Sequence, residues 1–122
     1  GRDIDWQVGD LPEVQGDPGP ALVVSWGSTY ETLTEALGQL KKEGRRFGHL
    51  HLSQLWPLPQ RALQNLLGGT QRLILVENNA GGELGGLLAQ VALRRPDRQI
   101  QRMDGRPFLV DQLAQQLTEA LP

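Results

Sequence analysis

The sequence predicts an α/β domain in which a mainly parallel sheet carries helices on both faces. Two apolar runs, ALVVS from residue 21 and LILV from residue 73, show no alternation, which is typical of strands covered on both sides. Segments with leucines at helical spacing follow the predicted strands, so the order is strand then helix, four times over. Strands that alternate with helices favour right-handed crossovers and therefore parallel neighbours.

The first 20 residues are predicted to be a linker, because Gly, Pro and Asp cluster there after a weak alternating patch around Trp6. The α/β domain is expected over residues 21–122. Its first core strand leads into a helix with apolar residues at helical spacing, which Gly44 ends. Ser28 and Glu31 have the spacing of a capping box at the start of this helix.

The next segment, FGHLHLSQLWPLP, alternates polar residues with leucines and predicts a strand with two unlike faces, ended by Pro57. Pro59 suits the first turn of a second helix, which two glycines end at residues 68 and 69. After LILV, leucines between residues 84 and 91 predict a third helix, and QIQR predicts a weak strand. Asp111 is predicted to cap the final helix.

Composition excludes several classes of function. A chain of 122 residues with 39% hydrophobic residues fits one domain. The formal net charge is -2, and the charged residues form no block of either sign, so a nucleic-acid partner is not indicated. No apolar stretch approaches the roughly 20 residues that a membrane-spanning helix requires. Without cysteine the chain offers no thiolate ligand or nucleophile. We expect a cytoplasmic location, and a piece of a longer protein because the first residue is Gly1.

Two loops are the best candidates for a site, because ligands of open parallel sheets bind beyond the carboxyl ends of the strands. WGST follows the first core strand and VENNAGG follows the third, and both pass into predicted helix N-termini. Neither is a nucleotide signature such as GxGxxG. One interpretation is helix capping and turn formation. The other is an interface or switch-point role, and the candidate residues are Trp26, Ser28, Glu77, Asn78, Asn79 and Gly81.

His49 and His51 lie two apart on a predicted strand and therefore on one face. A metal pair is one interpretation, but no third ligand stands at recognisable spacing. The alternative is that both are polar residues facing a helix, a neighbouring strand or a partner chain. A serine triad has no support, because Ser25 and Ser28 lack the GxSxG context of a nucleophile elbow.

Four blocks of the sequence together carry a resemblance to a known family. VVSWGSTYETLTEAL, GHLHLSQLWPLP, LILVENNAGGELGGLL and RMDGRPF, in this order, resemble the C-terminal domain of the alpha subunit of 2-oxoacid:ferredoxin oxidoreductases, nearest the 2-oxoglutarate enzyme. The resemblance covers residues 21–121. It implies a fold like the transketolase C-terminal domain, a three-layer α/β/α sandwich with a mixed sheet of about five strands. It also implies one antiparallel edge strand, expected around Trp6.

The same resemblance implies a function for the parent enzyme, which oxidatively decarboxylates a 2-oxoacid, joins the acyl group to coenzyme A and reduces ferredoxin. Thiamine diphosphate, magnesium and an iron–sulfur cluster are implied elsewhere in that enzyme, and no cofactor or catalytic residue is implied in this domain. Its implied partners are the remainder of the alpha subunit and the beta subunit. This domain would be a noncatalytic structural and interface module.

Sequences of the family that this chain resembles often carry the pattern proline, glutamate, any residue, asparagine, any residue, glycine, glutamine after the third core strand. Glu77, Asn79 and Gly81 match this pattern, whereas Val76 replaces the proline and Gly82 the glutamine. The backbone turn is therefore expected, without the contact that the glutamine side chain would make.

Two other classes of function compete with this interpretation. A stand-alone flavodoxin-like module would bind an anion or small ligand at the switch-point loops. A small hydrolase or metal enzyme would need the triad or ligand spacing that the sequence lacks.

Overall fold

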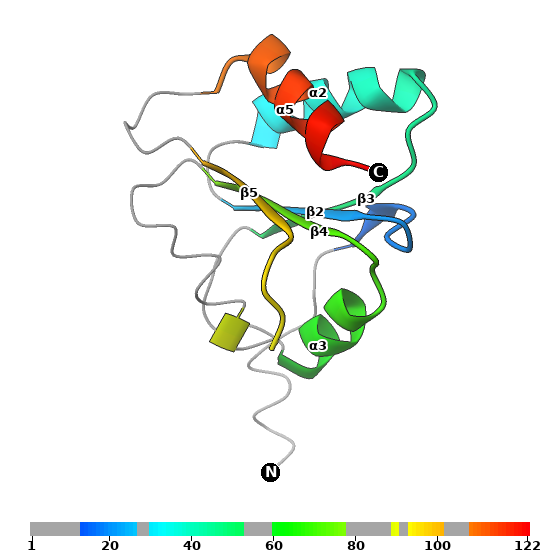
Figure 1. The fold of residues 1–122 in the computed structure, drawn as a ribbon, viewed down its shortest axis with the longest axis vertical. Coiled ribbons are helices and arrows are strands. Elements are labelled where there is room, and N and C mark those ends of the chain that lie inside the picture. Colours follow the sequence, from blue (N-terminus) through cyan, green and yellow to red (C-terminus); the bar gives the residue numbers. More distant parts are fainter. Residues whose placement is uncertain (1–12, 27–29, 53–59, 78–88, 91–92, 102–107) are drawn as a thin grey trace.

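The computed structural model describes residues 13–26, 30–52, 60–77, 89–90, 93–101 and 108–122 (Figure 1). These residues form one sheet with helices on both of its faces. The elements in chain order are β1 (Gln15–Gly16), β2 (Leu22–Trp26), α2 (Tyr30–Lys42), β3 (Gly48–Leu52), α3 (Gln60–Gly68), β4 (Leu73–Glu77), β5 (Arg98–Gln101) and α5 (Val110–Ala120). The predicted α/β sandwich is therefore confirmed.

The sheet is mixed and has five strands in the order β1-β3-β2-β4-β5. β2 pairs in parallel with β3 and β4, and β4 pairs in parallel with β5, whereas β1 runs antiparallel to β3. The segment around Trp6, where the antiparallel strand is expected, lies outside the described residues. The antiparallel strand that the structure contains is at Gln15–Gly16.

Close backbone approach holds β1 and the following turn against β3. Gly16 has a φ of +85°, and a Cβ there would lie 2.4 Å from the carbonyl oxygen of Phe47. A Cβ on Gly48 would lie 2.9 Å from the backbone of Pro18. Both positions therefore require glycine, one for its conformation and both for the space.

Each face of the sheet contributes one half of the core. Helices α2 and α5 cover one face and α3 covers the other (Figure 1). Because side chains alternate along a strand, Val23 packs under α2 and α5 while Leu22 and Val24 pack under α3. Fully burying one such aliphatic side chain stabilises the fold by roughly 1.5 to 3 kcal/mol, so both helical layers are needed.

The described helices follow the predicted periodicity. Helix α2 buries Leu33, Ala36, Leu37 and Leu40, and α3 buries Leu63 and Leu67. The prediction that Asp111 caps α5 is wrong, because the N-cap is the extended Leu109, which makes no side-chain capping bond, and Asp111 lies in the first turn. Most of the helix predicted between residues 84 and 91 lies outside the described residues. No helix in the described part of the chain is long and apolar enough to cross a membrane.

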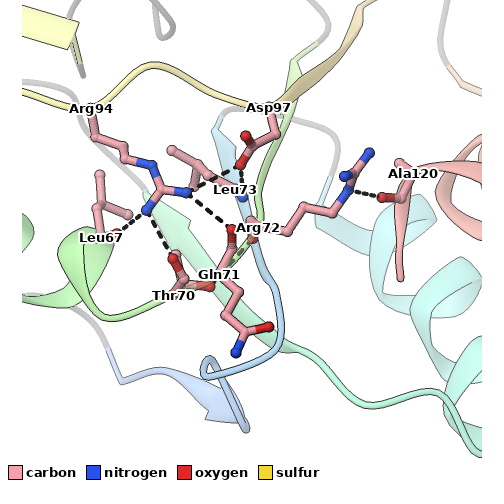
Figure 2. Close-up of polar contacts among 8 residues, drawn as sticks. All are labelled: Leu67, Thr70, Gln71, Arg72, Leu73, Arg94, Asp97 and Ala120. Atoms are coloured by element: carbon pink, nitrogen blue, oxygen red, sulfur yellow. Dashed lines mark hydrogen bonds and ion pairs between the residues drawn. The ribbon is translucent and has the colours of Figure 1, made fainter.

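Arg94 ties the end of α3 to the amino edge, by which we mean the edge of the sheet where the parallel strands begin (Figure 2). Its Nη1 donates to the carbonyl oxygens of Leu67 and, at 2.9 Å, of Thr70. Its Nη2 lies 3.1 Å from Oδ2 of Asp97, which also accepts a 2.7 Å bond from the backbone N–H of Leu73. One guanidinium thus satisfies carbonyls at a helix C-terminus and links them to the starts of β4 and β5.

Two further arginines hold the C-terminal end of α5 at the same edge. Arg72 donates from Nε to the carbonyl oxygen of Ala120 (Figure 2). Arg45 donates from Nη2 to the carbonyl oxygens of Thr118, at 2.8 Å, and Leu121, at 3.1 Å. A cation at a helix C-terminus also interacts favourably with the helix dipole. Arginines in the segments that lead into strands therefore hold the helix ends at the amino edge.

Candidate functional site

The carboxyl ends of β2 and β4 form the switch point of the sheet. The chain passes from β2 through α2 to β3 on one side, and then through α3 to β4 on the other side of β2. Trp26 and Glu77, the last residues of these two strands, are register partners. The two predicted loops therefore leave the sheet at neighbouring points of its carboxyl edge, the edge at which the parallel strands end.

The structure describes two of the six predicted site residues. Trp26 is partly buried against the apolar cluster under α3, and alternation places Glu77 on the same face. Glu77 is 0% exposed. A buried carboxylate needs compensating interactions, so within this chain the acid belongs to the interior of the strand end and not to an open surface. The residues outside the described part are Ser28, Asn78, Asn79 and Gly81.

On the opposite face of the sheet, a buried serine joins both histidines of the chain. Oγ of Ser25 lies 2.9 Å from Nε2 of His49 and 2.8 Å from Nδ1 of His51. β2 and β3 are parallel neighbours in which Ser25 pairs with His51 and Val23 with His49. The expectation that both histidines share one face of a strand and meet a neighbouring strand is confirmed.

Tyr30, the first residue of α2, covers the two imidazoles. Its ring centroid lies 6.1 Å from that of His49 and 4.8 Å from that of His51, and the residue is 40% exposed. Burial is the largest of the causes that lower the pKa of His49 from 6.5 to about 4, and the nearby His51 and Lys41 act in the same direction. His49 is therefore a neutral histidine under α2 at neutral pH.

This serine–histidine cluster was not found by sequence reasoning, although its members were considered separately. The sequence signal that could have revealed the cluster is alternation along the strands. Residues 25, 49 and 51 alternate with apolar core residues, and the pairing of β2 with β3 brings them together. Ser25 is 0% exposed, so its hydroxyl does not face a substrate as a nucleophile would. The described residues contain no group of three histidine, cysteine, aspartate or glutamate side chains that could hold a metal.

Comparison with known protein families identifies the family of this chain. Residues 20–113 match the family model described as pyruvate:ferredoxin oxidoreductase core domain II. The chain belongs to this family. The core domain II match includes β2 to β5 and the start of α5, and thus both strands of the switch point.

Relatives of this core domain II chain include much longer proteins. The chain is 37% identical over 86 residues to the alpha subunit of 2-oxoacid:ferredoxin oxidoreductase 2 from Aeropyrum pernix, a match that covers 70% of this chain and 13% of the relative. It aligns with a TM-score of 0.79 and 25% identity to a 2-oxoglutarate:ferredoxin oxidoreductase from Magnetococcus marinus solved with 2-oxoglutarate, coenzyme A and succinyl-CoA, covering 90% of this chain and 19% of that chain.

A third comparison concerns the fold alone. A split-gene transketolase, described as an inactive beta4 tetramer, matches with a TM-score of 0.65 and 16% identity over 89% of this chain and 41% of that chain. The transketolase-like architecture implied by the resemblance is therefore confirmed. Since the chain spans only 13% to 19% of the oxidoreductase chains, it corresponds to one domain of them.

Proposed function

We propose that this chain is a noncatalytic structural and interface domain in the alpha subunit of a thiamine-dependent 2-oxoacid:ferredoxin oxidoreductase. The observation that carries the proposal is the match of residues 20–113 to core domain II. The similarity to an alpha subunit, of which this chain covers only 13%, supports it. The parent enzyme would convert a 2-oxoacid to its acyl-CoA and reduce ferredoxin. We propose 2-oxoglutarate as the substrate, because the solved relative binds 2-oxoglutarate and succinyl-CoA. We propose the cytoplasm as the location of the enzyme.

The residues of this chain do not fit the iron–sulfur cluster of such an enzyme. Iron–sulfur clusters are held mainly by cysteine thiolates, and the sequence contains no cysteine. The ring nitrogens of His49 and His51 that face Ser25 are engaged by its hydroxyl. We therefore assign thiamine diphosphate, magnesium, the cluster and coenzyme A to other parts of the alpha subunit and to the beta subunit.

The carboxyl edge is the surface that we assign to docking against the rest of the alpha subunit and the beta subunit. At this edge Trp26 remains partly exposed and Tyr30 is 40% exposed, whereas the amino edge is held by arginine–carbonyl bonds. Aromatic side chains of this kind are common interface anchors. Buried Glu77 would act indirectly, by holding the end of β4 in place.

The test is to supply this chain in trans to the remaining part of the alpha subunit and the beta subunit, and to measure association by calorimetry. Specific association is expected, weakened at least tenfold by Trp26→Ala and unchanged by Gln115→Ala, a substitution at an exposed position of α5. Circular dichroism of each variant verifies its fold. The chain alone is expected to show no saturable binding of thiamine diphosphate with magnesium. Absence of association, with tight binding of a nucleotide or other small anion by the chain alone, would favour the flavodoxin-like alternative.

A further inference from the structure

The geometry at Ser25 restricts where protons can lie in the serine–histidine cluster. A serine hydroxyl has one hydrogen and two acceptor lone pairs. Two imidazole nitrogens lie within 2.9 Å of this one oxygen, Nε2 of His49 and Nδ1 of His51. Ser25 can donate to only one of them, and its hydrogen finds an acceptor within the cluster only when it donates to one histidine and accepts from the other.

Adding a proton fixes the direction of the two hydrogen bonds. A charged imidazole carries hydrogen on both nitrogens and can only donate. If His51 is charged, Nδ1 donates to Ser25, and Ser25 donates to Nε2 of His49, which must then carry its own proton on Nδ1. If both histidines were charged, both would donate to one oxygen, and the serine hydrogen would have no acceptor within the cluster. With one positive charge every hydrogen of the two bonds and of the hydroxyl has an acceptor in the cluster, whereas with two charges the serine oxygen accepts from both rings and its own hydrogen has no acceptor there.

The surroundings decide that His51 takes the first proton. His49 is 5% exposed, whereas His51 is only partly buried, and burial disfavours the charged form. The described groups around His49 are Tyr30 and Lys41 from α2, Ser25 from β2 and His51 from its own strand. Lys41 and a charged His51 both oppose charge on His49. In contrast, the Tyr30 ring lies 4.8 Å from His51, within the range of a cation–π contact.

We propose that Ser25, His49 and His51 form a two-step proton switch under the first turn of α2. The first proton resides on His51, sets His49 as the neutral Nδ1–H tautomer that accepts from Ser25, and leaves Tyr30 in place. The second proton enters on His49, turns Nε2 into a donor, leaves the Ser25 hydrogen without an acceptor in the cluster and releases Tyr30 with the first turn of α2. The switch is a property of this chain alone and is independent of the proposed enzyme.

Nitrogen-15 NMR of the histidine side chains, recorded on this chain from about pH 8 to about pH 4, tests the switch because imidazoles titrate in this range. During the first step only His51 is expected to give the imidazolium signature, while Nε2 of His49 stays unprotonated. The backbone amide of Tyr30 is expected to shift little in this step and strongly in the second. Charging of His49 first or of both histidines in one step, or a proton on Nε2 of His49 while His51 is charged, would overturn the proposal.

Two substitutions separate the hydroxyl from the packing around it. Ser25→Ala removes the bridge, so the tautomer of His49 is expected to become mixed and independent of the titration of His51. Ser25→Thr keeps the hydroxyl and is expected to restore the fixed tautomer. A fixed Nδ1–H tautomer of His49 in Ser25→Ala would show that the hydroxyl does not couple the rings. The spectra of the unmodified chain decide the proposal even if either variant fails to fold.

Discussion

The two edges of the sheet are held by different chemistry. At the amino edge, Arg94, Arg72 and Arg45 donate to carbonyl oxygens at the ends of α3 and α5, and these bonds join helices to strands. At the carboxyl edge, Ser25 binds two histidines under a partly exposed tyrosine, and a buried acid ends β4. The first set closes helix ends. The second places titratable groups beside the switch point, where the domain would meet other parts of an enzyme.

The largest expected difference between the edges is their response to acid. Since the pKa of His49 is lowered to about 4 in the fold, the unfolded chain takes up this proton first. The corresponding stability is fully present above pH 6.5 and is lost as the pH falls toward 4. A shift of this size corresponds to about 3 kcal/mol of unfolding free energy. Urea unfolding at about pH 7 and about pH 4.5 measures the loss, which His49→Gln should largely abolish.

The amino edge titrates in a lower range. The bond from the backbone N–H of Leu73 and the nearby Arg94 hold the pKa of Asp97 below its usual 3.8. The stability from a lowered carboxyl pKa is present above 3.8 and is lost as the pH falls below it. If the domain lost stability only below pH 3.8, the loss that we assign to His49 between pH 6.5 and about pH 4 would be contradicted.

The next largest effect is expected at Arg94. Arg94→Ala removes bonds to the Leu67 and Thr70 carbonyls and the ion pair with Asp97, and a lost charge-assisted hydrogen bond costs roughly 1.5 to 3 kcal/mol. We expect a decrease of about 2 kcal/mol in the unfolding free energy by urea denaturation. Arg95→Ala, at an exposed neighbour, is the matched control and should change stability by less than about 0.5 kcal/mol. Equal losses in both variants would show that the Arg94 bonds do not stabilise the amino edge.

Whether a feature of the two edges can be predicted from the sequence depends on how far apart in the sequence the interacting residues lie. The periodicity of α2 and the apolar run of β4 are local signals, and both elements are confirmed. The serine–histidine cluster and the bonds from Arg94 to the Leu67 and Thr70 carbonyls require knowing which elements are neighbours, because they join residues more than 20 positions apart. The capping prediction at Asp111 failed because Phe108 and Val110 pack on the core, so α5 begins before the acid.

Gly48 gives a smaller test of how tightly the start of β3 is packed. Gly48→Ala would place a Cβ 2.9 Å from the Pro18 backbone and is expected to cost roughly 1 to 3 kcal/mol, as in other overpacked sites. The matched change, Gly38→Ala within α2, meets nothing within 4 Å and should stabilise by up to about 1 kcal/mol. Thermal denaturation of the two variants should therefore shift in opposite directions. A shift of both in the same direction would contradict this difference in packing.

The smallest expected effect concerns Leu93, directly before Arg94. Leu93 has a φ of +58°, a left-handed conformation that disfavours a side chain, and it is 77% exposed. Leu93→Gly should relieve this strain and raise the unfolding free energy by about 0.5 kcal/mol after the entropy cost of glycine in the unfolded chain. Leu93→Ala keeps the Cβ and should give no gain. A gain from alanine as large as that from glycine would show that the backbone is unstrained.

The most direct test of the contrast is backbone hydrogen exchange of this chain, alone and bound to the remaining part of the alpha subunit supplied in trans. Docking through the carboxyl edge predicts slower exchange at Trp26, Glu77 and the first turn of α2. It also predicts unchanged exchange at the amino edge, in residues 70–73 and 118–121. Slower exchange confined to the amino edge would contradict the account, and so would uniform slowing across both edges.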